Sequence, residues 1–230
     1  MDGDLHSPMY MLCAESSRKF PQSKPADPSN IMSYASGSAN MKKEDQKIML
    51  TNVFWPSVST LYEEPMLLLL DSWSANTDEV LIKSTIPESI SEFEWHLIPP
   101  GCTGLIQPLD VYFFRPYKAF VKFVTDAIIA TEEFNIWHRD NFIRLQSFTH
   151  YQFSSPMFRN MIKYAWYKSG YLDEEPEPFR TPMQYCCDTV GSEVCSSDQC
   201  SAFSFMRCAH CNNTFCLNHL LIDSLHINCT

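Results

Sequence analysis

The chain is organised around a segment that begins with MLLLLD at residues 66–71 and ends with IPPGCTGLIQPLD at residues 98–110. The apolar run at 66–70 predicts a strand that is buried on both faces. Asp71 follows it directly, at the end of a strand where open α/β sheets bind their ligands. Asp110 lies at the expected start of a helix, where the helix dipole favours a negative charge. Two such carboxylates at one sheet edge would form part of a Mg²⁺ site, although an aspartate in this position also serves as a cap or turn former.

The same residues resemble a known family. LLLLD followed by IPPGxTxxxQPLD is similar to the catalytic core of DDE-type transposases, closest to the pogo and Tigger branch of the mariner-like superfamily. The resemblance implies an RNase H-like fold that cuts and joins DNA with two divalent metals, Mg²⁺ or Mn²⁺, held by three carboxylates. Asp71 matches the second of these carboxylates and Asp110 the third. Only eight residues precede the first predicted strand at 9–14, so the resemblance implies a core without its opening strand and first carboxylate.

Hydrophobic periodicity predicts the elements around this segment. A strand is expected at 9–14 and an amphipathic helix at 42–53. Thr77 is expected to cap a short helix that ends at Ser84, and the next strand at 94–98 would complete a parallel strand–helix–strand unit.

The pattern becomes helical after Asp110 and continues to residue 128, with Pro116 expected to kink or restart the helix. A further helix is expected at 138–153, and another between a Ser155 cap and Gly170. The first of these helices carries a basic stripe on one side, which is either a phosphate contact or an ordinary solvated face. The stripe consists of Arg115, Lys118 and Lys122.

Three regions follow from this division of the chain. Residues 1–172 are expected to form the α/β core, which the resemblance implies is a partial RNase H-like fold with a mixed sheet and flanking helices. Residues 173–185 are acidic and proline-rich and predict a linker. Residues 186–230 are rich in cysteine and histidine and predict a small zinc-binding module.

Eight cysteines and histidines of this last region come in four closely spaced pairs, which are Cys195/Cys200, Cys208/Cys211, Cys216/His219 and His226/Cys229. Closely spaced pairs let one turn supply two ligands of a tetrahedral zinc ion. Four successive pairs suit a cross-brace with two structural Zn²⁺ ions, in which the first pair joins the third and the second joins the fourth. His210, Cys186 and Cys187 are further ligand candidates, and disulfides in a secreted module are the alternative. The arrangement resembles RING- or PHD-like cross-braces and the cysteine-rich tails of some transposases.

Composition limits the function classes. The chain has 230 residues with 45% hydrophobic content, enough for one sizeable core and a small module. Its net charge of −10 does not suit a free-standing nucleic-acid binder. No apolar run is long enough for a membrane span, and the first residues lack the pattern of a signal peptide, so an intracellular protein is expected.

Three functions remain open. The first is a DDE endonuclease and transposase core in which Asp71 and Asp110 hold Mg²⁺. The second is a catalytically inactive protein that binds nucleic acid, chromatin or a protein partner through the zinc module, and the third is a decayed transposon fragment. The missing first carboxylate predicts that the chain alone neither cleaves nor joins DNA. DNA as partner and the nucleus as location are implied by the resemblance alone.

Overall fold

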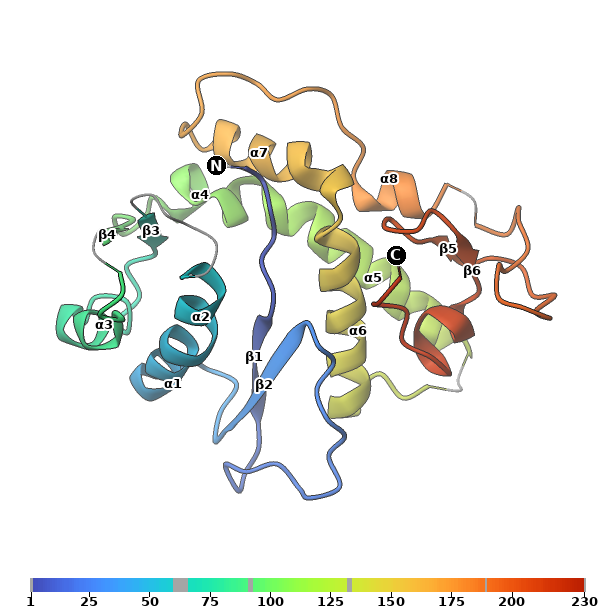
Figure 1. Cartoon of the computed structure of the whole chain (residues 1–230), viewed down its shortest axis with the longest axis horizontal. Coiled ribbons are helices and arrows are strands. Elements are labelled where there is room, and N and C mark those ends of the chain that lie inside the picture. The colour runs from blue at the N-terminus through green and yellow to red at the C-terminus, as the bar shows by residue number, and fades with distance from the viewer. Residues whose placement is uncertain (1, 60–65, 91–92, 132–133, 189, 230) are drawn as a thin grey trace. The chain divides into compact units, whose positions relative to one another are not determined.

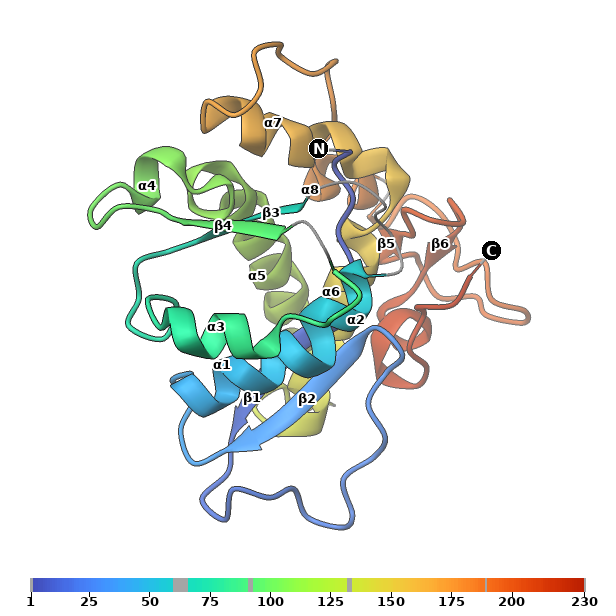
Figure 2. The same ribbon diagram turned by 60° about the vertical axis from the view of Figure 1, so that its left-hand side comes forward.

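The structure is a computed structural model that describes residues 2–59, 66–90, 93–131, 134–188 and 190–229. Its chain divides into two compact units (Figures 1 and 2). The amino-terminal unit comprises His6–Gln107, and the carboxyl-terminal unit comprises Met1–Leu5 and Pro108–Thr230. The predicted linker at 173–185 lies inside the carboxyl-terminal unit, so it does not coincide with the division between the units.

The amino-terminal unit contains two pairs of strands and several short helices. In chain order these are β1 (Met9–Ala14), β2 (Ile31–Ser36), α1 (Lys43–Met49), the π-helix η1 (Leu50–Phe54), α2 (Trp55–Val58), β3 (Met66–Leu70), α3 (Glu79–Thr85), β4 (Phe93–Leu97) and α4 (Thr103–Ile106). The expected helix at 42–53 is therefore the continuous run of α1 and η1, which α2 extends.

The predicted strand–helix–strand unit is confirmed. β3 and β4 pair in parallel, with Met66 opposite Phe93 and Leu70 opposite Leu97, and α3 lies between them in the chain. β1 and β2 also pair in parallel. Among the described residues the strands form separate two-stranded sheets, so the observed class is mixed α/β with small sheets.

The prediction that the 66–70 strand is buried on both faces is wrong. Met66 and Leu70 pack against the core of the unit, whereas Leu67 is 56% exposed. Successive side chains of a strand point to opposite faces, so the face that carries Leu67 is covered less completely than the face that carries Met66 and Leu70. An apolar run identifies a strand but does not distinguish one covered face from two.

Trp55 lies at the centre of the amino-terminal core. It is almost fully buried and packs with Leu50, Val58 and Ile82. Its indole Nε1 donates to the Thr85 hydroxyl at 3.1 Å, which satisfies the one polar group of the side chain. The α1–α2 helical run is thereby held against α3.

The cap of α3 differs from the expected one. Asp78, rather than Thr77, is the N-cap residue, and its Oδ1 accepts from the Leu81 N–H at 3.0 Å. Its Oδ2 accepts from Lys43 of α1 at 2.8 Å, so one carboxylate caps α3 and joins it to α1. The Lys43 bond, followed by the Leu81 N–H bond, lowers the pKa of Asp78 below its usual 3.8.

We expect Asp78→Ala to destabilise the amino-terminal unit, because it removes both the cap and the ion pair. Since the folded-state pKa lies below the unfolded one, this stabilisation is present above pH 3.8 and is lost as the pH falls through the folded pKa. Urea unfolding followed by tryptophan fluorescence at pH 7 and in more acidic buffer measures the difference. Thr77→Ala is the matched control. A larger loss for Thr77→Ala at pH 7 would restore the sequence-based cap.

The carboxyl-terminal unit is built from helices and from the cysteine-rich segment, which is residues 186–230. Its elements are the π-helix η2 (Leu109–Phe113), α5 (Phe114–Thr131), α6 (Arg139–Phe153), the 3₁₀-helix η3 (Pro156–Phe158), α7 (Arg159–Lys168), α8 (Pro182–Cys186), β5 (Met206–Arg207), β6 (Thr214–Phe215) and the π-helix η4 (Asn218–Ile222). Pro116 is the third residue of α5, and the helical run changes from π to α two residues before it without a break in the helix.

The helices and the cysteine-rich segment share one hydrophobic core. Phe120, Phe148 and Phe153 of α5 and α6 belong to the same buried cluster as Met206 and Leu220 of the cysteine-rich segment. The stacked rings of Phe123 and Phe205, with centroids 5.2 Å apart, add a second contact between the two parts. The cysteine-rich segment therefore buries its apolar side chains against the helices.

Candidate metal centres

Two clusters of four metal-binding side chains lie in the cysteine-rich segment. Centre 1 consists of Cys195, Cys200, Cys216 and His219, and centre 2 consists of Cys208, Cys211, His226 and Cys229. Within each cluster the ligand atoms all lie within 4.8 Å of one another. The structure therefore brings the first pair to the third and the second to the fourth, which is the order of the predicted cross-brace.

Local backbone geometry explains how each pair converges. β5 and β6 form an antiparallel hairpin whose turn presents Cys208 and Cys211. The Cys208 N–H donates to the Asn213 carbonyl at 2.8 Å, and Asn212 has a positive φ of 62°, which closes this turn. Cys216 lies two residues before η4 and His219 lies in its first turn, so the turn into this helix brings the two ligands together.

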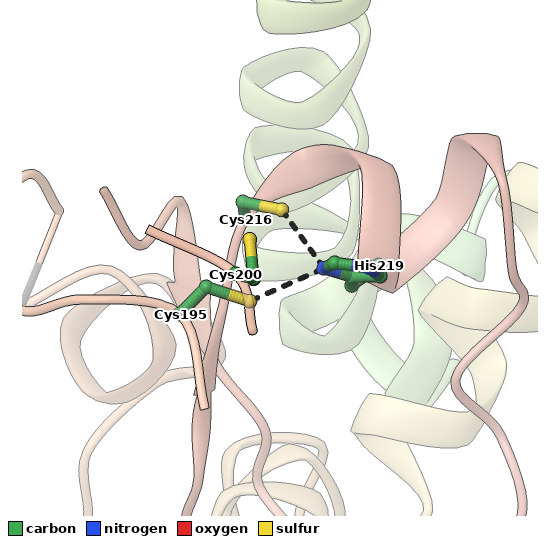
Figure 3. Close-up of side chains that lie close together, drawn as sticks. All are labelled: Cys195, Cys200, Cys216 and His219. Carbon is green, nitrogen blue, oxygen red and sulfur yellow. Dashed lines mark hydrogen bonds between the residues drawn. The ribbon is translucent and has the colours of Figure 1, made fainter. Parts of the chain in front are cut away.

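The separations between ligand atoms suit zinc. In centre 1 the Nδ1 of His219 lies 3.4 Å from Cys195 Sγ and 3.3 Å from Cys216 Sγ (Figure 3). In centre 2 the two sulfurs of Cys208 and Cys229 are 3.6 Å apart, and Cys211 Sγ lies 3.5 Å from His226 Nε2. Tetrahedral zinc places neighbouring Cys and His ligand atoms about 3.5–3.8 Å apart, close to the separations in both clusters. Three thiols and one imidazole at these distances form a donor set that could hold one Zn²⁺ in each centre.

The surroundings of the ligand groups shift several of their pKa values. Burial by itself would raise the pKa of Cys195, but hydrogen bonds from the Cys216 and Ser197 backbone lower it to about 6. Burial raises the pKa of Cys208 to about 12. Burial, together with the nearby His210, lowers the pKa of His226, so its imidazole is neutral and available as a ligand at pH 7.

The further ligand candidates lie outside both clusters. The Nε2 of His210 lies 2.6 Å from the Tyr151 carbonyl, and its ring stacks on the Tyr151 ring with centroids 3.9 Å apart. Cys186 is fully buried and Cys187 half-buried, and burial raises the pKa of both. All ten cysteines are free thiols.

Side chains from the end of α6 contact centre 2, and sequence analysis missed them. Ser155 was expected to cap the following helix, but its hydroxyl donates instead to the Ala209 carbonyl at 2.8 Å. Gln152 contacts Cys208 and Ala209, and the Tyr151 hydroxyl lies 3.1 Å from Cys229 Sγ. One sequence signal was present, since Gln152 is a polar residue on the buried stripe of α6, four positions after Phe148.

The two predicted catalytic aspartates lie in different units. Asp71, directly after β3, accepts from the Asn76 side-chain amide at 2.6 Å and from the Trp73 N–H at 3.2 Å. Asn76 in turn accepts from the side chain of the buried Gln46 at 2.7 Å. These bonds give Asp71 the role of a turn former, and they leave its place in a metal site as a prediction.

Asp110 belongs to the carboxyl-terminal unit. It is exposed in η2, the π-helix that leads into α5, where its charge suits a helix start. That its carboxylate meets the carboxylate of Asp71 at one sheet edge also stays a prediction. The basic stripe of Arg115, Lys118 and Lys122 is exposed, and Lys122 forms an ion pair with Asp126 at 2.5 Å.

Comparison with known families identifies the cysteine-rich region. Residues 166–229 match the model of the Tc5 transposase C-terminal domain. The chain is related to transposases. The matched region begins within α7 and contains all eight ligand candidates. Neither the curated proteins nor the solved structures contain a match.

No helix among the described residues is both long and apolar enough to cross a membrane.

Proposed function

We propose that this chain is a transposase-derived, nucleic-acid-associated protein whose carboxyl-terminal unit is held together by two structural zinc ions. The observation that carries the proposal is the match to a transposase C-terminal domain that encloses two Cys₃His clusters. Structural zinc sites are closed tetrahedra of this kind, without an open position for a substrate. We therefore assign zinc a structural role. From the relationship to transposases we also propose the nucleus as the site of action.

The amino-terminal region is proposed to derive from a DDE endonuclease core with an RNase H-like fold. In such a core Asp71 and Asp110 would be two of three carboxylates that hold Mg²⁺ or Mn²⁺. The metals, when bound, supply an activated nucleophile and stabilise the leaving oxygen of a phosphodiester. The Asn76 side-chain amide donates to Asp71 and orients its carboxylate. Carboxylates that bind metals are commonly oriented by such hydrogen bonds, so this contact is compatible with the proposed origin. A site short of one carboxylate is not expected to hold both ions.

The basic stripe of α5 is the proposed DNA contact. Arg115, Lys118 and Lys122 are all exposed on one helix, and such side chains neutralise phosphates. The net charge of −10 opposes binding, so the association is expected to be weak and to require low salt. A protein partner bound through the zinc domain, without DNA, is the alternative, and the same negative charge favours it.

We expect the chain to slow the migration of supercoiled plasmid through a gel at low salt, which is retention by binding. We do not expect it to nick the plasmid in Mg²⁺ or Mn²⁺. Retention reports binding, and the plasmid topology reports cleavage. Asp71→Ala serves as the control for a metal-dependent reaction. Nicking by the wild-type chain that disappears in Asp71→Ala would show that a further carboxylate completes the site. Absence of retention at low salt would instead favour the protein-binding alternative.

A further inference from the structure

We infer that Gln152, at the end of α6, is a positioning residue of centre 2, which it fastens to the helical core by holding the Cys208–Ala209 peptide. The inference rests on the proposed zinc centres and concerns one of them only. Gln152 is fully buried. A buried side-chain amide is unfavourable unless its donors and acceptor find partners, so its contacts report what the position requires.

Both ends of the Gln152 amide contact the turn that carries Cys208. Its Oε1 accepts from the Ala209 N–H at 2.8 Å. Its Nε2 donates to Cys208 Sγ at 3.6 Å, a normal length for a hydrogen bond to sulfur. An N–H donor that points at a ligand sulfur favours the thiolate form of that cysteine and fixes the direction of its side chain. Hydrogen bonds to metal ligands commonly have this effect.

Two neighbouring side chains, Tyr151 of α6 and Ser155 between α6 and η3, also contact residues of centre 2 or next to it. Ser155 donates to the Ala209 carbonyl, so both polar groups of the Ala209 backbone are bound from the helical side. Tyr151 stacks on His210, and its hydroxyl accepts from the Cys229 N–H at 3.2 Å. Two ligands of centre 2, Cys208 and Cys229, are thus oriented from α6.

Centre 1 is oriented differently. The sulfur of Cys195 receives hydrogen bonds from the backbone of Cys216 and from Ser197, which both belong to the cysteine-rich segment. The Nδ1 of His219 contacts the sulfurs of Cys195 and Cys216 within the same segment. A change in the amide of Gln152 should therefore alter centre 2 and leave centre 1 as it was.

Gln152→Glu tests this inference with little change in shape. The carboxylate keeps the acceptor for the Ala209 N–H but places an oxygen without a proton against Cys208 Sγ. We expect one of the two zinc ions to transfer to a competing chelator about tenfold faster or more, with the other at the wild-type rate. When cadmium-113 replaces zinc, one of the two signals in the cadmium NMR spectrum should shift.

Gln146→Glu is the matched control on the same helix. Its Oε1 accepts from the Tyr117 hydroxyl at 2.6 Å, a bond that a carboxylate retains, so both transfer rates should stay at the wild-type value. Gln152→Met provides a second test without added charge, since it removes both hydrogen bonds and keeps an unbranched side chain. We expect it to affect the same ion by a smaller factor.

Unchanged rates for both ions in both Gln152 variants would overturn the inference. Equal acceleration of both ions would also overturn it, because that result indicates general destabilisation of the unit. A wild-type chain that holds no zinc would refute the proposed centres themselves, an outcome that is seen before any variant is made.

Discussion

Cys208→Ser is expected to leave the protein with one bound zinc ion in place of two and with an unfolded centre 2. Cys208 is fully buried and supplies one of four ligand atoms, so its loss opens a closed tetrahedral site. Structural zinc contributes about 10–16 kcal/mol in isolated zinc-finger peptides, more than the whole stability of many domains. Since centre 2 contacts α6 directly, the loss should also lower the melting temperature of the helices.

Cys187→Ser is the control for this substitution. Cys187 is a half-buried thiol of the same cysteine-rich segment but lies outside both clusters, so the variant should keep two zinc ions. Metal analysis of protein purified without added zinc, together with circular dichroism melting, gives both results. Two zinc ions in Cys208→Ser, or fewer than one in the wild type, would be incompatible with the cross-brace.

Phe153→Ala is expected to destabilise the carboxyl-terminal unit by about 3–5 kcal/mol, the usual cost of removing a fully buried aromatic side chain. Phe153 is completely buried at the end of α6. Its ring lies with its centroid 5.2–6.3 Å from four aromatic partners, which are Phe113, Tyr117, Phe120 and Phe158. These partners belong to η2, α5 and η3, so the cavity would open where three elements meet.

Urea unfolding measures this effect, and Phe142→Ala on the same helix is the control. Phe142 is 42% exposed, so its removal should cost much less. A comparable loss for both variants would mean that Phe153 does not occupy the centre of the core. Because the cysteine-rich segment shares this core, Phe153→Ala should also weaken zinc retention.

Local signals predicted much of the fold. The strand at 66–70, the parallel pairing with the strand after it and the helix at 139–153 could be inferred because an apolar run or a helical period is a property of neighbouring residues. The caps were less predictable. Thr77 and Asp78 are both good caps, and in the structure Asp78 caps α3 and also pairs with Lys43 of α1. Ser155 bonds to Ala209, a residue far away in the sequence.

The candidate metal centres show the same division. Pair spacing from Cys195 to Cys229 predicted which residues would gather and in what order, because a tight turn delivers two ligands from a few residues. Spacing gave no information on Tyr151 and Gln152, which reach centre 2 across more than fifty residues of chain. In the amino-terminal unit, the apolar run at 66–70 likewise could not show that Met66 and Leu70 are packed while Leu67 is exposed.

The sequence by itself determined the transposase relationship, the strand–helix–strand segment that carries Asp71 and the eight ligand candidates, since each of these is encoded in residues close together in the chain. Only the tertiary structure decided that the cysteine-rich segment shares its core with α5 and α6 and that a buried glutamine contacts one metal centre. The physical reason is that burial and hydrogen bonds to ligand atoms depend on which distant elements pack together, and local spacing carries no record of that packing.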